Sequence, residues 1–338
     1  MARRHFATLA LGLCAAFAAA AQPAELLLKA SDAARTANYR GVVIYRAGGN
    51  MESMRLTHGF AAGVERERVV ALTGEPREII RIDNKVMCLL PQDRKLDLKR
   101  PALKGLLTNV TVQSLKDLSA WYALREIGTA RVAGRVCRGV ELAPRDGYRF
   151  GFEIWADEAT GVPLKVALVG PGRHALEEVM FTEVEFPASL PDEAFEPQLD
   201  PKRFKAVTRV EPALKELAGG VADISDYPLR FDALPPGYKV TLRDQREGNE
   251  LRGRVEHLMI SDGLSAVSIF AALGVSPEKA FSGHTQRGSV QAHGRVMGRY
   301  HVTVVGETPR ATVEMVANGL RLNEAADKPA DKAAAPKP

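Results

Sequence analysis

The stretch Gly134–Phe186 decides the fold of this chain. It contains the runs GRVCRGVEL (Gly134–Leu142), YRFGFEIWADEATGVPLKVALV (Tyr148–Val169) and HALEEVMFTEVEF (His174–Phe186). Apolar and polar residues alternate, and the alternation breaks at Asp146-Gly147, Thr160-Gly161 and Pro171-Gly172. A period of two, interrupted by residues that turn easily, is typical of antiparallel hairpins. The stretch therefore predicts a curved antiparallel sheet with one apolar face.

The residues before this stretch continue the strand pattern. A helix is expected first, because Leu26, Ala30, Ala33 and Ala37 recur at helical spacing. Between Pro101 and Ala120, Leu115 and Leu118 suggest a helical turn or two, and strands resume near Tyr122. The strand candidates, separated by Gly, Pro, Asn and Asp turns, are Arg40–Ala47, Ser53–Phe60, Val64–Leu72, Arg77–Arg81, Lys85–Leu90 and Arg94–Leu98.

The residues after Glu185 predict a connection and a second domain. Prolines recur through Phe186–Pro201, and the polar stretch to Ser225 favours a linker with a helix near Pro212–Leu217. A smaller β-rich segment begins at Tyr227. It ends in a helix that Thr308 caps, that has Pro309 in its first turn, and whose apolar face is Val313, Val316, Ala317 and Leu320. The expected domains are 22–200, a linker at 201–226, 227–322, and a disordered Ala/Lys/Pro tail at 323–338.

Residues 1–21 resemble a signal peptide. Arg3 and Arg4 precede an apolar core at Phe6–Phe17, and Ala19 and Ala21 form a small-residue cleavage pattern. Leu13 before Cys14 disfavours lipoprotein processing. No later apolar run is long enough to span a bilayer. We expect a periplasmic chain that is cleaved near Ala21 and does not span the membrane.

The charge pattern bears on the class of partner, and the cysteine content bears on a possible disulfide. The formal net charge is +5, to which Arg3 and Arg4 contribute, and basic residues are dispersed among acidic ones. This pattern favours a solvated surface over a nucleic-acid site. Cys88 and Cys137 are the cysteines left after cleavage, and spacing alone leaves open whether they form a disulfide.

The sequence offers little chemistry for catalysis. It contains no metalloprotease helix motif, paired-cysteine zinc pattern, nucleophile elbow or phosphate loop. His293 and His301 fall on neighbouring strand candidates but do not make a metal motif. The acidic pairs Glu177/Glu178 and Glu183/Glu185 have the spacing of a solvated strand face. We therefore predict a binding protein rather than an enzyme, without cofactor or metal.

The apolar sheet face needs a cover, which is either the protein's own helices, a second domain or a hydrophobic ligand. An ordinary filled core remains an alternative for each residue. The candidates for lining a lipid pocket are Val43, Tyr45, Phe150, Phe152, Ile154, Trp155 and Leu164.

Several motifs carry a family resemblance. The segment WADEATGVPLK (Trp155–Lys165) resembles a hairpin of bacterial lipoprotein-carrier domains. Together with it, and in order along the chain, stand ARVAGRVCRGVEL (Ala130–Leu142), DGYRF (Asp146–Phe150), LPPGY (Leu234–Tyr238), SDGL (Ser261–Leu264) and VGETP (Val305–Pro309). Behind an export signal, this order resembles the RseB/MucB family of periplasmic regulators of the envelope-stress sigma factor.

The resemblance implies an α+β protein of two domains. The larger is a lipoprotein-carrier-like half barrel with helices in its concavity, and the smaller is β-rich with a C-terminal helix. The implied partner is the periplasmic domain of a membrane-spanning anti-sigma factor, which the family shields from proteolysis. Lipid, lipopolysaccharide or lipoprotein acyl chains would release that protection.

Two other functions remain open, as does a homo-oligomeric state. A periplasmic lipoprotein carrier would share the larger domain but would have no use for Tyr227–Leu320. An exported hydrolase would need catalytic groups assembled from distant residues.

Overall fold

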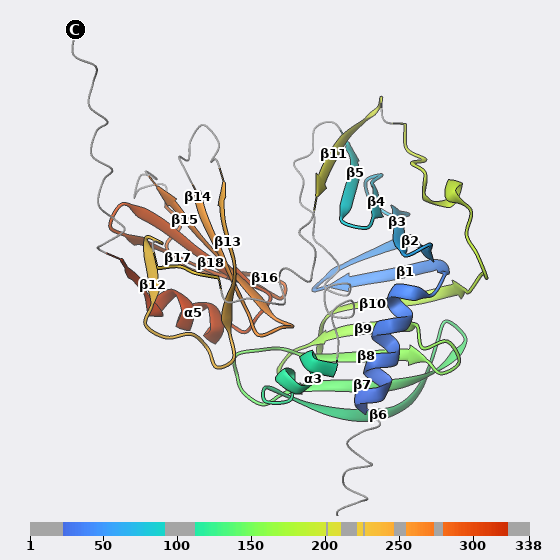
Figure 1. Cartoon of the computed structure of the whole chain (residues 1–338), viewed down its shortest axis with the longest axis horizontal. Coiled ribbons are helices and arrows are strands. Elements are labelled where there is room, and N and C mark those ends of the chain that lie inside the picture. The colour runs from blue at the N-terminus through green and yellow to red at the C-terminus, as the bar shows by residue number, and fades with distance from the viewer. Residues whose placement is uncertain are drawn as a thin grey trace, which may run out of the picture. The chain divides into compact units, whose positions relative to one another are not determined.

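The chain divides into two compact units (Figure 1). The computed structural model describes residues 23–91, 112–200, 202–210, 222–225, 227–246, 255–273 and 280–323. The large unit comprises Met1–Asp146 and Phe150–Glu216, and the small unit comprises Gly147–Arg149 and Leu217–Pro338. The predicted signal peptide, the strand Arg94–Leu98, the helix Pro212–Leu217 and residues 324–338 of the tail lie outside the described residues.

The described strands of the large unit form one antiparallel sheet. Its order is β11-β5-β4-β3-β2-β1-β10-β9-β8-β7-β6. The strands are β1 (Tyr39–Ala47), β2 (Asn50–Ala61), β3 (Val64–Ala71), β4 (Glu78–Ile82), β5 (Lys85–Pro91), β6 (Tyr122–Val132), β7 (Arg135–Pro144), β8 (Gly151–Asp157), β9 (Pro163–Val169), β10 (Ala175–Glu185) and β11 (Phe204–Val210). The short helix α3 (Val112–Leu118) confirms the helical turns expected around Leu115 and Leu118.

A helix over residues 23–36 covers part of one sheet face, which we call the core face (Figure 1). Leu27 and Ala30 are fully buried on it, whereas Leu26, assigned to the apolar stripe from the sequence, is half-buried. Ala33 packs in one cluster with Val43, Leu164 and Phe181 from three strands. The helix covers these side chains because strand alternation points them all to the same side.

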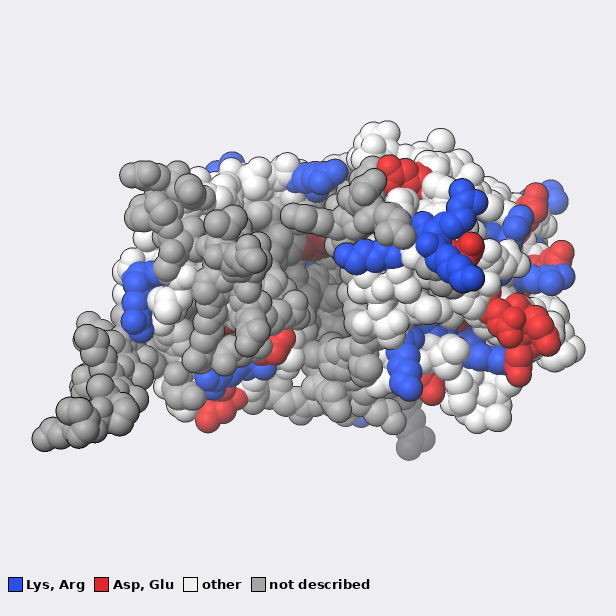
Figure 2. Space-filling model, turned by 90° about the horizontal axis from the view of Figure 1, so that it is seen from above, with Lys and Arg blue, Asp and Glu red and all other residues white. Residues whose placement is uncertain are grey.

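Ion pairs between strands mark the opposite face. Lys165 contacts Glu178 at 2.7 Å, and Arg173 lies 3.4 Å from both Glu141 and Glu153. Figure 2 shows the same mixture of basic and acidic residues over the described surface in view. No helix within the described ranges is long and apolar enough to cross a membrane.

The segment after β10 does not behave as the linker predicted from its prolines. Strand β11 lies within the predicted linker 201–226 and pairs with β5, from Phe204 opposite Pro91 to Val210 opposite Lys85. Its sequence FKAVTRV does not alternate strictly between apolar and polar residues, so the strand was not apparent from its pattern. Upstream, Phe195 is buried against Gly59 beneath the guanidinium of Arg66, and this contact fixes the chain to β2 and β3.

Cys88 on β5 and Cys137 on β7 are both buried. The sequence left their pairing open, and no disulfide joins them in this structure. Burial raises the pKa of the Cys137 thiol to about 11. Such a thiol stays protonated at neutral pH and is chemically inert.

The small unit has a six-stranded antiparallel sheet of order β13-β14-β15-β18-β17-β16 and a two-stranded sheet β12-β19. Its elements are β12 (Leu229–Phe231), β13 (Lys239–Arg246), β14 (Val255–Ser261), β15 (Ala266–Leu273), β16 (Gly283–Arg287), β17 (Val290–Met297), β18 (Tyr300–Gly306), α5 (Arg310–Gly319) and β19 (Leu320–Leu322). The expected second β-rich fold with a final helix is confirmed.

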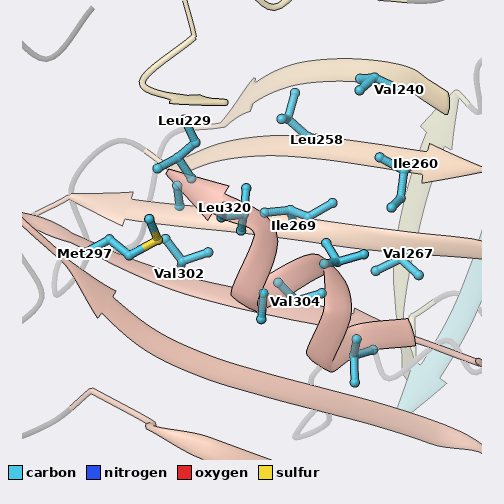
Figure 3. Close-up of a cluster of buried hydrophobic side chains, with 14 of the residues drawn as sticks. Leu229, Val240, Leu258, Ile260, Val267, Ile269, Met297, Val302, Val304 and Leu320 are labelled. Atoms are coloured by element: carbon cyan, nitrogen blue, oxygen red, sulfur yellow. The ribbon is translucent and has the colours of Figure 1, made fainter. Parts of the chain in front are cut away.

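The core of this unit lies between the sheet and α5 (Figure 3). Leu258, Ile269 and Val304 project from neighbouring strands toward α5 and are fully buried. The predicted apolar residues Val313, Val316, Ala317 and Leu320 are fully buried as well.

Two predictions at the ends of this unit were wrong. Pro309 occupies the N-cap of α5, and the hydroxyl of Thr308 is buried without a hydrogen-bond partner, so Thr308 does not cap the helix. Asn323, assigned to the tail, donates its side-chain amide to the carbonyls of Ser225 and Tyr227. That contact closes the end of the β12-β19 ribbon.

The buried carboxylate of Glu78 gives the first testable prediction. It pairs with Arg68 and accepts hydrogen bonds from the backbone N–H groups of Gln198 and Leu199, both at 3.0 Å. Glu78→Ala leaves a buried guanidinium unpaired and should lower the free energy of unfolding by about 3 kcal/mol. Urea denaturation measures this change. Glu196→Ala, at an exposed site in the same segment, should change stability by less than about 0.5 kcal/mol.

Candidate functional site

The core face of the large unit contains a small hollow where β1, β8, β9 and β10 lie side by side. Its volume is about 10 Å³, which is room for about one water molecule. Pockets that bury a drug-sized ligand begin at about 300 Å³, so the hollow has no room for an acyl chain in this conformation. The lining residues are Tyr45, Phe152, Val166, Leu168, Glu177, Glu178 and Val179.

Tyr45, Glu177 and Glu178 are the polar side chains in the lining of the hollow. The Tyr45 hydroxyl donates a 2.8 Å hydrogen bond to Oε2 of Glu177. Glu177 is only 6% exposed, so its assignment to a solvated strand face was wrong. The strand register explains the difference, because Glu177 has the same parity as Val179 and Phe181 and so faces the core with them. In the segment LEEVMF (Leu176–Phe181), Glu177 lies two residues before Val179 and four before Phe181. This spacing could have predicted from the sequence that Glu177 faces the core.

The structure brings together only part of the predicted lining. Tyr45 and Phe152 line the hollow. Val43, Ile154 and Leu164 lie on the same face but are 1% exposed, inside the packed core. Phe150 precedes β8 and is 7% exposed. That these residues bind a lipid stays a prediction.

Trp155 is not among the residues that line the hollow. A side chain added at Gly139 would meet the Trp155 ring at 2.7 Å, which shows that the indole lies directly over this glycine. Trp155 is partly buried and packs against the cluster that contains Val43, Leu164 and Phe181.

Asp157 organises the hairpin that follows Trp155. Its Oδ2 accepts hydrogen bonds from the backbone N–H of Thr160 at 2.9 Å and from the Thr160 hydroxyl at 2.8 Å. Arg135 on β7 donates to both carboxylate oxygens, at 2.8 and 3.0 Å. Gly161 completes the turn with φ of 80°, a conformation that favours glycine. The W-x-D and T-G parts of the motif thus hold β8 and β9 in register.

These contacts also set the protonation of Asp157. Burial alone would raise the pKa of the carboxyl group. The hydrogen bonds from Arg135 and Thr160 outweigh burial, and the pKa lies below its usual value. The ionised form is therefore the one that the fold stabilises.

His293 lies beside another histidine, but not beside His301. It pairs with His284 across β17 and β16, and alternation puts His293 and His301 on opposite faces of the sheet. The Nε2 atom of His301 lies 2.7 Å from the carbonyl oxygen of Phe281. Within the described ranges, no group of three or more His, Cys, Asp and Glu residues is placed to hold a metal ion.

The sequence is similar to two family models that together span both units of the chain. Residues 22–199 match the MucB/RseB N-terminal domain, and residues 224–321 match the MucB/RseB C-terminal domain. The chain belongs to the MucB/RseB family. The sigma factor AlgU regulatory protein MucB of Pseudomonas aeruginosa is 30% identical over 323 residues, which cover 91% of this chain and 94% of that protein. The sigma-E factor regulatory protein RseB of Escherichia coli K12 is 24% identical and covers 91% of this chain and 93% of its own length.

Solved structures agree with the family assignment. A structure of the Pseudomonas aeruginosa MucA/MucB complex contains a chain that is 26% identical, with a TM-score of 0.68, over 89% of this chain and 99% of that one. A second structure, of MucB in complex with MucA(peri), has the same identity and TM-score and covers 88% of this chain and 98% of that one. The MucB/RseB relationship therefore extends over both units of the chain.

Asp157→Asn gives a test that depends on pH. The amide keeps an oxygen for Thr160 but loses the ion pair with Arg135, so the free energy of unfolding should fall by about 2 kcal/mol at pH 7. Because the folded-state pKa of Asp157 is lowered, its stabilisation is present above the unfolded pKa of about 3.9 and is lost as the pH falls through the folded pKa. Urea denaturation at pH 7 and in acid should show the difference between the two proteins shrinking in acid. A constant difference would contradict the role given to the charge.

Tyr45→Phe tests the polar edge of the hollow. Removal of the hydroxyl deprives the buried Glu177 of this hydrogen bond and should cost about 1–3 kcal/mol of stability. In a double-mutant cycle with Glu177→Leu, the double variant should lose less than the sum of the single losses, with a coupling of about 1 kcal/mol. Additive losses would mean that the two side chains do not support each other.

Proposed function

We propose that this protein is a periplasmic regulator that binds the periplasmic domain of a membrane-spanning anti-sigma factor and blocks its proteolysis. The observation that carries the proposal is the match to both MucB/RseB domains over nearly the whole chain. The related MucB was solved together with MucA(peri), and the curated relatives are named regulatory proteins of AlgU and sigma-E. The protein would act by binding rather than by catalysis.

The same proposal includes release by lipid. An acyl chain of a lipid, lipopolysaccharide or lipoprotein would enter the core face at the hollow beside Tyr45 and Phe152. Because the hollow holds about one water molecule as it stands, the bound and free conformations of β1 and β8–β10 must differ. A ligand that favours one conformation and a partner that favours the other oppose each other by population shift.

Two features support the regulator over the competing functions. A lipoprotein carrier has no use for a separately packed small unit with its own core of Leu258, Ile269 and Val304. An exported hydrolase is not suggested by any of the relatives named above, and a panel of ester and peptide substrates would reveal one. Light scattering of the mature protein, alone and with the partner, would establish whether it forms homo-oligomers.

Reciprocity provides the test of the proposal. Calorimetric titration should show that the mature protein binds the purified periplasmic domain of its anti-sigma factor. A saturating amount of that domain should weaken the binding of an acyl-chain probe by the same factor by which the probe weakens binding of the domain. A typical coupling of this kind is about 5–150-fold. Lipid affinity that is unchanged by the anti-sigma domain would exclude release by lipid, and absence of anti-sigma binding would exclude the regulator.

A further inference from the structure

The hollow on the core face has a polar side and an apolar side. Strand pairing places Tyr45 opposite Val179 and Glu177 opposite Leu168. Leu168 in turn lies opposite Phe152 on β8. The side chains of Tyr45 and Glu177 therefore lie where β1 meets β10, and the apolar side chains of β9 and β8 lie on the other side of the hollow.

The backbone fixes this division. The register of β1, β10, β9 and β8 is set by backbone pairing, so each lining side chain keeps its place along the hollow when rotamers change. A hollow that is widened by movement of side chains therefore keeps its carboxylate on one side and its apolar residues on the other. A ligand of the hollow has to match both sides.

Tyr45 holds the carboxylate of Glu177 in the hollow. The Tyr45 hydroxyl donates a 2.8 Å hydrogen bond to Oε2 of Glu177, and Glu177 is only 6% exposed. An ionised carboxylate accepts hydrogen bonds at roughly four sites on its two oxygens. The Tyr45 hydroxyl takes one of these sites, so the carboxylate can accept an N–H or O–H group of a ligand as well.

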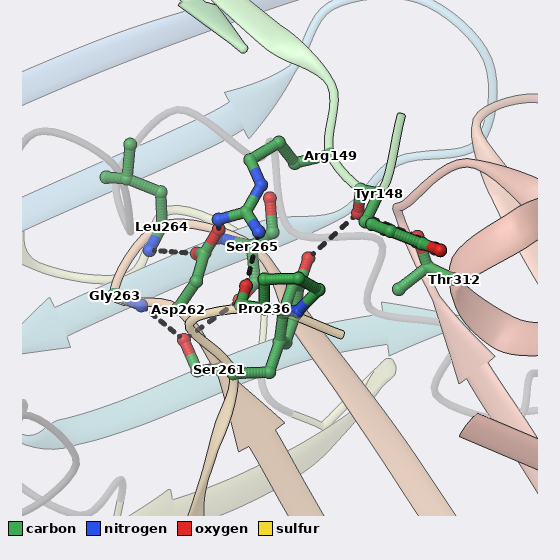
Figure 4. Close-up of polar contacts among 10 residues, drawn as sticks. Tyr148, Arg149, Pro236, Ser261, Asp262, Gly263, Leu264, Ser265 and Thr312 are labelled. Atoms are coloured by element: carbon green, nitrogen blue, oxygen red, sulfur yellow. Dashed lines mark hydrogen bonds and ion pairs between the residues drawn. The ribbon is translucent and has the colours of Figure 1, made fainter. Parts of the chain in front are cut away.

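The charged partners of other carboxylates show what is different about the hollow. Within the small unit, Asp262 accepts a 2.6 Å hydrogen bond from the guanidinium of Arg149 (Figure 4). Glu178, which also lines the hollow, lies 2.7 Å from Lys165. Among the described residues that line the hollow, none is a lysine or an arginine. An anionic group that enters it would therefore lie beside the carboxylate of Glu177, which is unfavourable, whereas an uncharged donor is favoured.

We infer that Glu177 selects the ligand of the hollow, and that this ligand is an acyl chain joined to its head group through an amide. An amide places an N–H donor directly beside the acyl carbonyl, where an ester has none. The N–H donates to Glu177, and the chain lies over Val166, Leu168 and Phe152. This inference rests on the lipid part of the proposed function and adds the chemical class of the lipid.

The first experiment compares probes that share a twelve-carbon acyl chain. Laurate, N-lauroylglycinamide and N-lauroylglucosamine are titrated by calorimetry into the full mature protein at about pH 8, below the concentrations at which they aggregate. At least one amide should bind about tenfold or more tightly than laurate, because a like charge beside Glu177 is costly. The amide that binds more tightly identifies the head group as a peptide or an amino sugar. Laurate that binds as tightly as both amides would overturn the inference.

The second experiment assigns the selection to one residue. Glu177→Gln removes the charge but keeps an oxygen that accepts from the Tyr45 hydroxyl. It should tighten the binding of laurate at least about fivefold and change the binding of the amides less than about twofold. The matched control is Glu183→Gln, at an exposed position of the same strand, which should keep the wild-type preference. An unchanged preference in Glu177→Gln, or an equal change in Glu183→Gln, would contradict the role of Glu177.

The comparison of probes in the wild-type protein keeps the test decisive if Glu177→Gln does not fold. Tyr45→Phe is then the second variant, because it removes the hydroxyl and keeps the carboxylate. It should retain the preference for the amides of about tenfold or more. Loss of that preference in Tyr45→Phe would show that the hydroxyl, and not the charge of Glu177, selects the ligand.

Failure of this inference differs from failure of the proposed function. Three probes that bind with equal affinity would overturn the selection by Glu177 and leave lipid binding intact. Absence of binding of all three probes would overturn the selection together with release by lipid. Calorimetry with the anti-sigma domain would then show whether the regulator itself stands.

Discussion

The large unit depends on the pairing of β1 with β10. This pairing joins two segments that are more than a hundred residues apart and places Val43 opposite Phe181 and Tyr45 opposite Val179. The register shifts between Val42 and Val43, and near this point the backbone carbonyl of Glu183 leaves no space beside Gly41. A Cβ atom on Gly41 would lie 2.0 Å from that oxygen. Glycine is therefore required where the two halves of the sheet meet. The β1–β10 pairing also brings together the strands that the N-terminal helix covers and the strands that line the hollow.

The buried carboxylates of Glu78, Asp157 and Asp262 are each paired with an arginine and with further hydrogen-bond donors. Glu78 meets Arg68 and two backbone N–H groups, Asp157 meets Arg135 and Thr160, and Asp262 meets Arg149 and two N–H groups. Glu78 joins β3 to the segment after β10, Asp157 joins β7 to the turn between β8 and β9, and Asp262 joins Arg149 to the turn between β14 and β15. Buried ion pairs contribute little net stability, but breaking one is costly, so they specify which segments come together. In this protein they specify the contact of Gln198 and Leu199 with β4, the turn between β8 and β9, and the burial of Arg149.

The local sequence pattern was sufficient to predict a strand or helix wherever the segment's own alternation or helical spacing determined it. The sequence predicted the strands between Tyr39 and Pro91 and between Tyr122 and Glu185, and it predicted the buried stripe of α5. These predictions succeeded because the period of the side chains follows directly from backbone geometry. The family motifs could likewise be recognised from the sequence. Interpretation failed where a partner distant in sequence was the deciding factor. Strand β11 needed β5, and Asn323 needed the carbonyls of Ser225 and Tyr227.

The loop DGYRF (Asp146–Phe150) shows most clearly where the local sequence no longer predicts the structure. Its residues are typical of an ordinary turn, and they correctly predict that β7 and β8 pair as neighbouring strands. That Arg149 is buried rather than solvated, and that its cation belongs to Asp262 more than a hundred residues away, was decided only by the tertiary structure. The reason is physical: the energy of a buried charge depends on the partners that folding brings to it, and those partners leave no trace in the local sequence.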